Sequence, residues 1–338
     1  MQTNRREFLK GSALMAATAG LAGGAADAPA AKTGALPLPA GAEFAGMNGA
    51  FSAMYTPFRA DGSLNEEMIE RLVEFGLANG LKGFYLTGST GEGFLLSPDE
   101  RKRVYARVAK VAKGRAKLIA HVGCLSTDDA KDLARYAAKV GMDWVSSVAP
   151  VYFGQNFDAA YDHYRKISEA TDLPFMIYSI GQQIVPDRDA KFFDLKNVKG
   201  MKYTGHSYWT VKCLKYRLNK PAVFMAGADE QEACAFALGD VFSGCIGTTD
   251  NTIPDIHAAL CAAADRGDAA EMARLQDQVV RFVELILAVS NGSWHKATMK
   301  YVGLDCGWGR APNGRPLTDE QLADLFARMD KLGFVKRA

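Results

Sequence analysis

The sequence predicts an α/β fold, a (β/α)8 TIM barrel with a C-terminal helical extension. Between residues 49 and 267, short strand-like runs rich in Val, Ile and Phe alternate with helical segments eight times. Such apolar strands, each followed by a helix, are typical of a parallel sheet buried on both faces. Eight such units can close into a barrel. A doubly wound open sheet is the alternative, but no glycine-rich dinucleotide motif follows the first strand.

The individual elements follow from local patterns. The first expected strand, residues 50–56, ends at Pro57, and the next segment, residues 65–78, has apolar residues at helical spacing. Ser97, with Glu100 three residues later, has the pattern of a capping box for a helix over residues 98–112. Further strands are expected at 83–87, 117–121, 144–148, 175–178, 198–203, 223–225 and 244–246, and further helices at 128–139 and 158–170.

Helical periodicity continues beyond the eighth unit, at residues 269–289, 293–302 and 318–332. A single α/β barrel occupies about 250 residues, so the chain is long enough for one barrel with extensions. We assign residues 49–267 to the barrel and residues 268–338 to C-terminal helices packed on it.

The composition is that of an ordinary globular protein. Of its 338 residues, 48% are hydrophobic and 23% are charged, and the formal net charge is +2. No dense cluster of Lys and Arg with interleaved aromatic residues is present, so a nucleic-acid partner is not expected.

The N-terminus has the pattern of an export signal. Arg5-Arg6 precedes an apolar run over residues 11–26, and Ala28-Pro29-Ala30 resembles a cleavage site. We therefore predict a twin-arginine signal peptide over residues 1–30, a linker over residues 31–48 and a periplasmic protein with no membrane contact after cleavage. A disordered tail that happens to carry two arginines is the alternative.

The six cysteines are scattered and show no CxxC pair or ligand-like spacing to histidine, so no metal site is predicted. An exported protein can form disulfides. A twin-arginine substrate folds before export in a reducing compartment, however, and buried free thiols are therefore favoured.

Lys202 is the candidate on which the other assignments depend. It lies among apolar and small residues at the end of the sixth expected strand, and barrel chemistry takes place at the carboxyl ends of strands. One interpretation is a strand-end lysine that reaches water. The other is a lysine in a desolvated pocket, where burial disfavours the charged form and a free amine can attack a carbonyl.

Other strand ends carry polar residues that would meet Lys202 at one rim. The second strand leads into Gly88-Ser89-Thr90-Gly91, where hydroxyls and amides can donate to a carboxylate, although a plain glycine-rich turn is the alternative. Tyr178, which ends the fifth strand, would face Lys202 across the barrel mouth as an acid/base partner, unless it is a core residue. The seventh and eighth strands end in residues 227–230 and 247–251.

Together these segments resemble the pyruvate-dependent class I aldolase superfamily of N-acetylneuraminate lyase and dihydrodipicolinate synthase. The resemblance covers residues 49–330 and favours the lyase branch. Its marks are Tyr55-Thr56-Pro57-Phe58, Gly88-Ser89-Thr90-Gly91-Glu92, Tyr178 and Gly200-Met201-Lys202-Tyr203-Thr204. The details that favour the lyase branch are Lys82-Gly83-Phe84-Tyr85, His121-Val122-Gly123, Gly227-Ala228-Asp229-Glu230 and the later Cys306-Gly307.

The resemblance implies a role for each matching residue. Lys202 would form an imine with pyruvate or with the C2 ketone of a sialic acid, and Tyr178 would move the proton. Ser89 and Thr90 would hold the substrate carboxylate, and Tyr152 would serve a neighbouring subunit's site in a homotetramer. The hydroxyl-rich tail of the sugar would bind at Thr204, Gly227, Asp229, Glu230 and Thr248.

The implied reaction is a retro-aldol cleavage of N-acetylneuraminate to N-acetylmannosamine and pyruvate. The imine is the electron sink, so no cofactor or metal is expected. The alternatives are an aldolase or dehydratase acting on another keto-deoxy sugar acid, a dihydrodipicolinate synthase, and a periplasmic binding protein without turnover.

Three positions bear on this choice. Dihydrodipicolinate synthases place an arginine where this chain has Gln183, which weakens the synthase interpretation. Asp250 stands where the lyase branch has an aromatic residue, which puts the sugar half of the substrate in question. His206 is a candidate for the pocket rim or an ordinary surface histidine.

Overall fold

The computed structural model describes residues 36–153, 156–288 and 294–334. The expected signal peptide, residues 1–30, lies outside the described residues. Within the described ranges, none of the helices combines the length and the apolar character that a membrane span requires.

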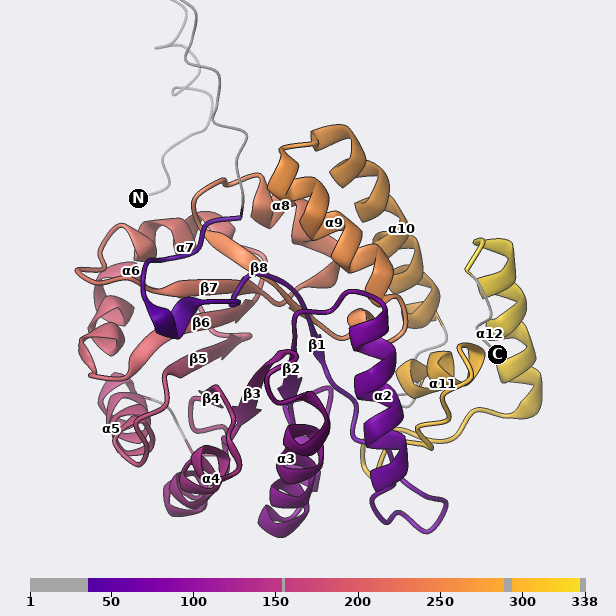
Figure 1. Ribbon diagram of the computed structural model, residues 1–338, viewed down its shortest axis with the longest axis horizontal. Helices are drawn as coiled ribbons and strands as arrows, with labels where there is room; N and C mark the ends of the chain where they lie inside the picture. Colours follow the sequence, from indigo (N-terminus) through magenta and orange to yellow (C-terminus); the bar gives the residue numbers. More distant parts are fainter. Residues whose placement is uncertain (1–35, 154–155, 289–293, 335–338) are drawn as a thin grey trace, which may run out of the picture. The chain divides into compact units, whose positions relative to one another are not determined.

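The fold is the predicted barrel. Eight parallel strands form a closed ring in sequence order, and β1 pairs with β8 to complete it. The helices surround this ring (Figure 1). The strands are β1 (Gly49–Ala53), β2 (Gly83–Leu86), β3 (Lys117–His121), β4 (Trp144–Val148), β5 (Phe175–Ile180), β6 (Val198–Thr204), β7 (Val223–Ala226) and β8 (Phe242–Gly247).

The helices alternate with the strands as expected, and several begin at side-chain caps. Ser97 and Glu100 form the predicted capping box at the start of α3. The α-helices of the barrel are α2 (Glu66–Ala78), α3 (Pro98–Ala112), α4 (Thr127–Val140), α5 (Phe157–Ser168), α6 (Pro186–Asp189), α7 (Tyr208–Lys215), α8 (Glu232–Phe236) and α9 (Pro254–Arg266).

The first strand is shorter than predicted, because a side chain ends its pairing. Asn251 accepts a hydrogen bond from the Tyr55 amide at 3.1 Å and donates to the Ala53 carbonyl at 2.8 Å. Met54 still donates to the Tyr85 carbonyl at 3.0 Å, but the Asn251 side chain replaces the strand partner of Tyr55, so the chain leaves the sheet at the rim.

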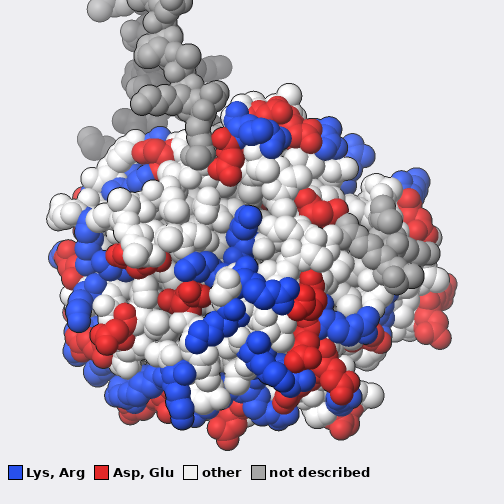
Figure 2. All heavy atoms as spheres, in the orientation of Figure 1, with Lys and Arg blue, Asp and Glu red and all other residues white. Residues whose placement is uncertain are grey.

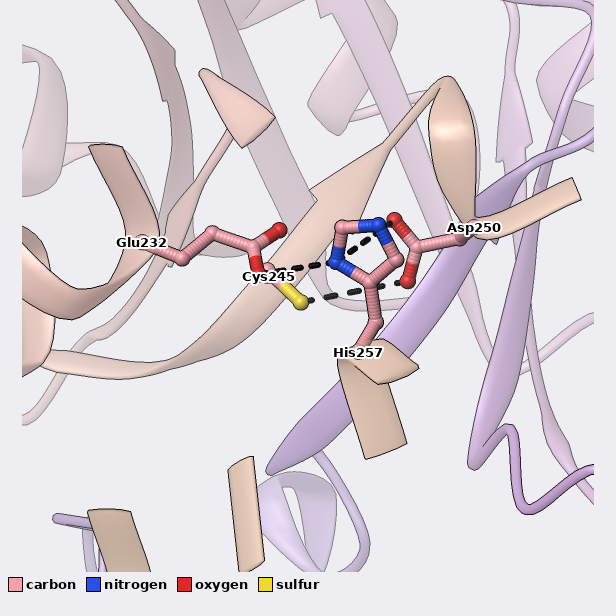
Figure 3. Close-up of side chains that lie close together, drawn as sticks. All are labelled: Glu232, Cys245, Asp250 and His257. Atoms are coloured by element: carbon pink, nitrogen blue, oxygen red, sulfur yellow. Dashed lines mark hydrogen bonds and ion pairs between the residues drawn. The ribbon is translucent and has the colours of Figure 1, made fainter. Parts of the chain in front are cut away.

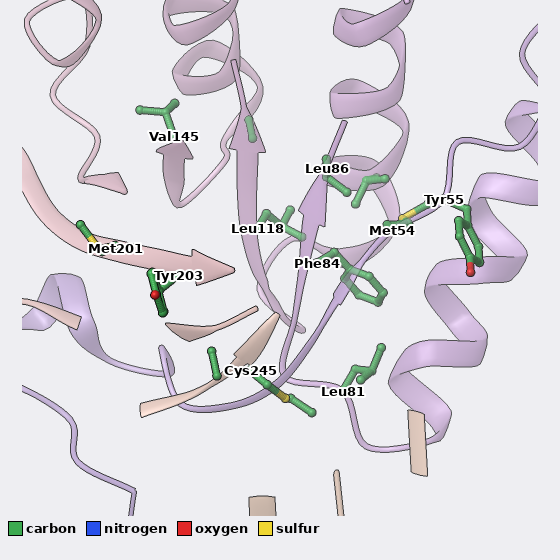
Figure 4. Packing of buried hydrophobic residues seen from close by; sticks show 14 of the residues in the cluster. Met54, Tyr55, Leu81, Phe84, Leu86, Leu118, Val145, Met201, Tyr203 and Cys245 are labelled. Carbon is green, nitrogen blue, oxygen red and sulfur yellow. The ribbon is translucent and has the colours of Figure 1, made fainter. Parts of the chain in front are cut away.

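Two apolar layers hold the barrel together. One fills the ring and includes Phe51, Tyr85, Trp144 and Met225. The other lies between the strands and the helices, where Figure 4 shows Phe84 and other outward-facing side chains packed together. Inward and outward residues alternate along each strand, which places alternate side chains inside the ring.

Residues 36–48, which fall in the predicted linker, pack on the barrel. Phe44 lies in η1 (Ala42–Phe44), and both Phe44 and Met47 are buried in the layer that fills the ring. Trp144, at the start of β4, donates from its indole nitrogen to the Glu43 carbonyl at 3.2 Å. This segment therefore closes the amino end of the barrel.

The C-terminal extension packs as helices α10 (Ala269–Ala288), α11 (Trp294–Tyr301) and α12 (Asp319–Lys331). Helix α12 packs against α10 and α11. The extension also reaches the first turn of α3, where Arg310 pairs with Glu100 at 2.5 Å, and the loop after β2, where the Arg310 amide donates to Glu92 at 2.7 Å. On the surface, Lys and Arg are interspersed with Asp and Glu over the face shown in Figure 2.

Candidate active site

Lys202 lies inside the barrel at the carboxyl end of β6, with only 3% of its surface exposed. Its Nζ lies 4.3 Å from the centroid of the Tyr178 ring and 4.8 Å from that of the Tyr85 ring. The side chain is therefore buried against two aromatic faces. Lys202 is therefore not a strand-end lysine that reaches water.

A second buried lysine shows what distinguishes Lys202. Lys296 of α11 is 2% exposed, but its ammonium pairs with Glu92 at 2.5 Å and donates to the Thr56 carbonyl at 2.7 Å. Among the described residues, no carboxylate lies within ion-pair distance of Lys202. Of these two amines, Lys202 is the one without a fixed carboxylate partner.

Tyr178 is the register partner of Lys202 on the adjacent strand. The two side chains lie next to each other, not across the barrel mouth as expected from the sequence. The Tyr178 hydroxyl shares a hydrogen bond with Ser89 Oγ at 3.1 Å. Burial alone would raise the pKa of Tyr178, but the Lys202 charge and hydrogen bonds from Ser89, Thr204 and Lys202 outweigh burial and lower it. A phenol with a lowered pKa beside an amine is suited to proton transfer.

Sequence reasoning assigned no role to Tyr85 or His121, which form the wall behind Tyr178. Their rings lie 5.8 Å and 5.9 Å from the Tyr178 ring, centroid to centroid. Burial, with the charge of Arg101, lowers the pKa of His121 well below its usual value. The neutral ring accepts from the Val148 amide at 3.3 Å through Nε2, so Nδ1 carries the proton and donates to the Thr87 carbonyl at 3.0 Å. Both residues belong to motifs of the resemblance, and the period-two alternation along the strands is the signal that would have placed them inside the ring.

The loop after β2 brings Ser89 and Thr90 to the same rim. Ser89 contacts Tyr178, and the hydroxyl of Thr90 shares a 2.7 Å hydrogen bond with that of Thr248 after β8. The backbone of this loop is unusual, since Thr87 and Glu92 have positive φ values of 53° and 54°. Such conformations need support from their surroundings and are common at functional sites.

Thr204 and Gly227 meet next to Lys202. Thr204 Oγ1 donates to the Gly227 carbonyl at 3.2 Å. A Cβ at position 227 would lie 2.2 Å from Thr204 Oγ1 and 3.1 Å from Lys202 Cε. Only glycine fits between these side chains.

Asp229 and Glu230 lie in η4 (Asp229–Gln231), directly after β7. The amide and the hydroxyl of Thr249 both donate to Asp229 Oδ2, at 2.7 Å and 2.6 Å. Glu230 is half-buried in the same turn, and Thr248 is half-buried at the end of β8. The tail-binding candidates therefore occupy one sector of the rim, beside Lys202.

A cavity of about 220 Å³ adjoins Ser89, Thr90 and Thr248. His295 and Asn313 of the C-terminal extension line its other side. This contact of the extension is not predicted from the sequence, because no motif links residues so far apart. The extension therefore lines one side of this cavity, opposite the loop that carries Ser89 and Thr90.

The remaining candidates lie away from Lys202. Tyr152 is 79% exposed in the loop after β4, and its ring packs on Phe153 at 5.1 Å. His206 is exposed after β6 and hydrogen-bonds with Gln231. Gln183 lines a cavity of about 300 Å³ outside the ring, against the outward face of β5. None of these three residues reaches the lysine pocket of its own chain.

Potential metal-ligating groups come together in one place. Glu232, Cys245, Asp250 and His257 are buried with their ligand atoms within 4.8 Å of one another (Figure 3). No metal site is predicted from the sequence, because the intervals between these four residues match no ligand motif. Thr249 links it to Asp229.

Comparison with known proteins identifies the relatives of this chain. A model of the dihydrodipicolinate synthetase family matches residues 46–331. An N-acetylneuraminate lyase from Rhizobium meliloti (strain 1021) is 34% identical over 286 residues, covering 83% of this chain and 93% of that protein.

Solved structures agree with this result. The crystal structure of N-acetylneuraminate lyase from Mycoplasma synoviae has a TM-score of 0.78 and 30% identity, covering 85% of this chain and 99% of the other. A dihydrodipicolinate synthase from Bacillus anthracis has a TM-score of 0.78 and 27% identity, covering 84% and 97%.

The barrel fold and these relatives together define the class of this protein. It is a pyruvate-dependent class I aldolase, which is a lyase. The chain belongs to the dihydrodipicolinate synthetase family. Enzymes of this family form a covalent Schiff base between substrate and a lysine and need no external cofactor.

Proposed function

We propose that the protein cleaves N-acetylneuraminate to N-acetylmannosamine and pyruvate through an imine on Lys202. The observation that carries the proposal is the Lys202 amine, buried at the end of β6 beside the phenol of Tyr178 and lacking the carboxylate partner that Lys296 has. The relatives named N-acetylneuraminate lyase support this choice of substrate.

Each side chain has a defined task in the proposed reaction. The Lys202 amine adds to the C2 carbonyl and water leaves, which gives an imine. Its protonated form draws the electrons of the C3–C4 bond, so the bond breaks to an enamine as the C4 hydroxyl loses its proton. Tyr178 takes the proton of the C4 hydroxyl, which becomes the aldehyde, and returns a proton to C3 of the enamine. Water then hydrolyses the resulting imine, which releases pyruvate and the free Lys202 amine. Ser89 and Thr90 donate to the substrate carboxylate, and Asp229 and Glu230 accept from the hydroxyls of the sugar.

Chemical trapping tests the proposal directly. Pyruvate with borohydride should add one reduced adduct to the protein, and peptide mapping should place it on Lys202, not on the equally buried Lys296. Lys202→Ala should abolish the adduct and the release of pyruvate from N-acetylneuraminate. An adduct on any other lysine would contradict the assignment of Lys202.

A second candidate substrate class is another keto-deoxy sugar acid. The observation that favours it is Asp250, which is fully buried with other acidic groups where the lyase branch has an aromatic residue. A panel of keto sugar acids distinguishes the two. Trapping at Lys202 combined with a better kcat/KM on another acid would select this candidate.

We further propose a homotetramer in which Tyr152 enters a neighbouring subunit's site. Its 79% exposure, distant from the lysine of its own chain, supports this placement. Tyr152→Phe should reduce activity strongly without changing the oligomer. Mixed oligomers of Tyr152→Phe and Lys202→Ala subunits should regain activity, since some sites then contain both native residues. A monomer in sedimentation would contradict the proposal.

We also propose export by the twin-arginine route, on the pattern of residues 1–30. Cell fractionation should find the protein in the periplasm with its N-terminus near residue 31. Replacing Arg5-Arg6 by Lys-Lys should retain it in the cytoplasm. Equal export of the two forms would contradict the proposal.

A further inference from the structure

A continuous chain of hydrogen bonds runs from the interior to Asp229. Glu232 in α8 contacts His257 in α9, with Oε2 and Nδ1 2.8 Å apart. His257 Nε2 lies 2.8 Å from the hydroxyl of Thr249, and that hydroxyl lies 2.6 Å from Asp229 Oδ2. Four elements, η4 (Asp229–Gln231), α8, η5 (Thr249–Asn251) and α9, thus contribute to one path.

The direction of these bonds follows from the number of protons available. Thr249 has one hydroxyl proton and gives it to Asp229 Oδ2, so its oxygen must accept at its other contact. His257 Nε2 therefore carries a proton and donates to Thr249. A proton also lies between Nδ1 and Glu232 Oε2, since 2.8 Å is a hydrogen-bond separation. The part of the path from His257 through Thr249 to Asp229 is therefore ordered outward.

The hydrogen-bonded path is buried from solvent along its length, and its outer end at Asp229 is the most exposed part. Glu232 and His257 are 0% exposed and Thr249 is 3% exposed, whereas Asp229 retains 7%. The Asp229 oxygen that faces Thr249 already has two donors. No donor from the described parts of the protein reaches its other oxygen, Oδ1. Asp229 is therefore the most exposed member of this hydrogen-bonded path, and its Oδ1, beside Gly247, is the acceptor that the path leaves unused.

Neighbouring charges hold the imidazole in this arrangement. Asp250 Oδ2 lies 3.9 Å from His257 Nδ1, with no hydrogen-bond partner within the described residues. Burial would lower the pKa of His257, but the charges of Asp250 and Glu232 outweigh burial and raise it. The His257 ring is thus fixed between acidic groups on one side and Thr249 on the other.

A metal ion is the competing occupant, since Glu232, Cys245, Asp250 and His257 are all ligand types. Ligands of one tetrahedral zinc, bound at about 2.0–2.1 Å, stand roughly 3.3 Å apart. The 2.8 Å between His257 Nδ1 and Glu232 Oε2 is shorter than that and fits a shared proton. The geometry therefore favours a hydrogen-bonded chain.

We propose that Glu232 and His257 are positioning residues which, through Thr249, hold Asp229 for the hydroxyl-rich half of the substrate. This rests on the proposed function, because Asp229 has a ligand to hold only if the substrate carries a polyol. Glu232 and His257 touch no substrate themselves. They act by fixing the rotamer of Asp229, so that its free oxygen accepts from a substrate hydroxyl without reordering.

The test separates the sugar half of the site from the pyruvate half. His257→Leu and Thr249→Val should raise KM for N-acetylneuraminate, or for the best acid of the panel, about tenfold, the size expected from one hydrogen bond to a charged group. Half-saturation by pyruvate in borohydride trapping at Lys202 should change less than twofold. If pyruvate could not be trapped on Lys202 of the unmodified enzyme, the proposed function itself would be refuted.

Conservative variants test the same contacts through KM even if the larger changes unfold the protein. Thr249→Ser keeps the hydroxyl, and Glu232→Gln keeps a partner for Nδ1, so KM in both should stay within threefold of the unmodified enzyme. Cys261→Ala is the packing control, because it removes buried volume from α9 and leaves the four residues of the hydrogen-bonded path unchanged.

Several outcomes would overturn the proposal. Equal losses for the sugar acid and for pyruvate would show a structural role, and unchanged KM values would show none. An equal KM increase in Cys261→Ala would assign the effect to packing. If no sugar acid bound, Asp229 would have no ligand to hold. If elemental analysis found one zinc ion per polypeptide, a metal ion, not a proton, would join His257 to Glu232.

Discussion

At the scale of single residues, the site depends on two opposing effects at Tyr178. Burial favours the neutral phenol, while the charge of Lys202 and three hydrogen bonds favour the phenolate more strongly. The balance lowers the pKa of Tyr178, although the side chain is only 2% exposed. A buried tyrosine without such neighbours, such as Tyr164, has its pKa raised by burial. The pairing of Tyr178 with Lys202 in register is therefore an electrostatic feature as well as a geometric one.

Removing the lysine should reverse this shift. In Lys202→Met the burial effect is no longer opposed by the amine, so phenolate formation at Tyr178 should move to higher pH. Absorbance at 295 nm, corrected by subtracting the curve of Tyr178→Phe, measures that one side chain. A Tyr178 titration that is identical with and without the lysine would contradict the electrostatic coupling.

At the scale of elements, His163 joins two helices to the barrel. It belongs to α5, its Nδ1 lies 2.9 Å from Thr127 Oγ1 in α4, and its Nε2 lies 3.4 Å from Ser147 Oγ in β4. Burial lowers the pKa of His163 to about 4. The neutral ring is therefore the form that fits between these elements.

The buried, neutral His163 should make the stability of the fold sensitive to acid. An unfolded histidine titrates near its ordinary pKa of about 6.5, so between pH 6.5 and pH 4 the unfolded state binds the extra proton. The free energy of unfolding should fall as the pH falls through this window, by up to about 1.4 kcal/mol per pH unit for each such histidine.

Urea unfolding at several pH values measures this slope. His163→Gln should unfold with a shallower slope than the unmodified protein in the same window. His121 and His295, whose pKa values burial also lowers, should keep part of the slope. Identical slopes for the variant and the unmodified protein would show that His163 carries none of it.

At the scale of the whole molecule, a buried ion pair attaches the C-terminal extension to the catalytic rim. Lys296 of α11 binds Glu92, which directly follows the turn that carries Ser89 and Thr90. The Arg310 amide donates to the other Glu92 oxygen at 2.7 Å. The extension is therefore part of the support for the loop that would hold the substrate carboxylate.

Breaking the pair from one side should be costly. Lys296→Met leaves Glu92 buried without its cation, and the free energy of unfolding should fall by about 3–5 kcal/mol. Lys296→Met combined with Glu92→Gln should recover most of that loss, because no buried charge is then left alone. Urea unfolding measures both values. Arg281→Gln breaks the exposed pair with Asp277 and is the control, with no measurable change expected. Equal stability of the single and double variants would contradict the argument.

Much of the fold could be predicted from the sequence, because it depends on local periodicity. The alternation of strands and helices is visible without knowledge of contacts, and the strand-end rule then places Lys202, Tyr178 and Asp229 at one rim. Even the capping box at Ser97 was evident, because both partners lie within one turn. Short-range patterns therefore accounted for the ring and for the position of its lysine.

The rest depends on contacts between distant segments. Phe44 and Met47 close the amino end of the barrel, but two apolar residues in a Gly/Pro/Ala-rich stretch have no periodicity to reveal them. Glu232 and His257 are 25 residues apart on different helices, so no spacing rule joins them. The lateral placement of Tyr178 beside Lys202 required the strand register, which periodicity alone does not give.

The pairing of β1 with β8 has a consequence for how the molecule forms. Gly49 of β1 lies beside Gly244 of β8, so one edge of β1 stays unpaired until β8, the last strand to be synthesised, is in place. Closing a loop of that length carries an entropic cost that grows with the logarithm of the residues enclosed. Every strand from β2 to β7 can find its predecessor soon after it emerges, whereas the seam between the two ends joins last. Ring closure is thus expected to be a late step in folding, and the lysine pocket acquires its full rim only when it is complete.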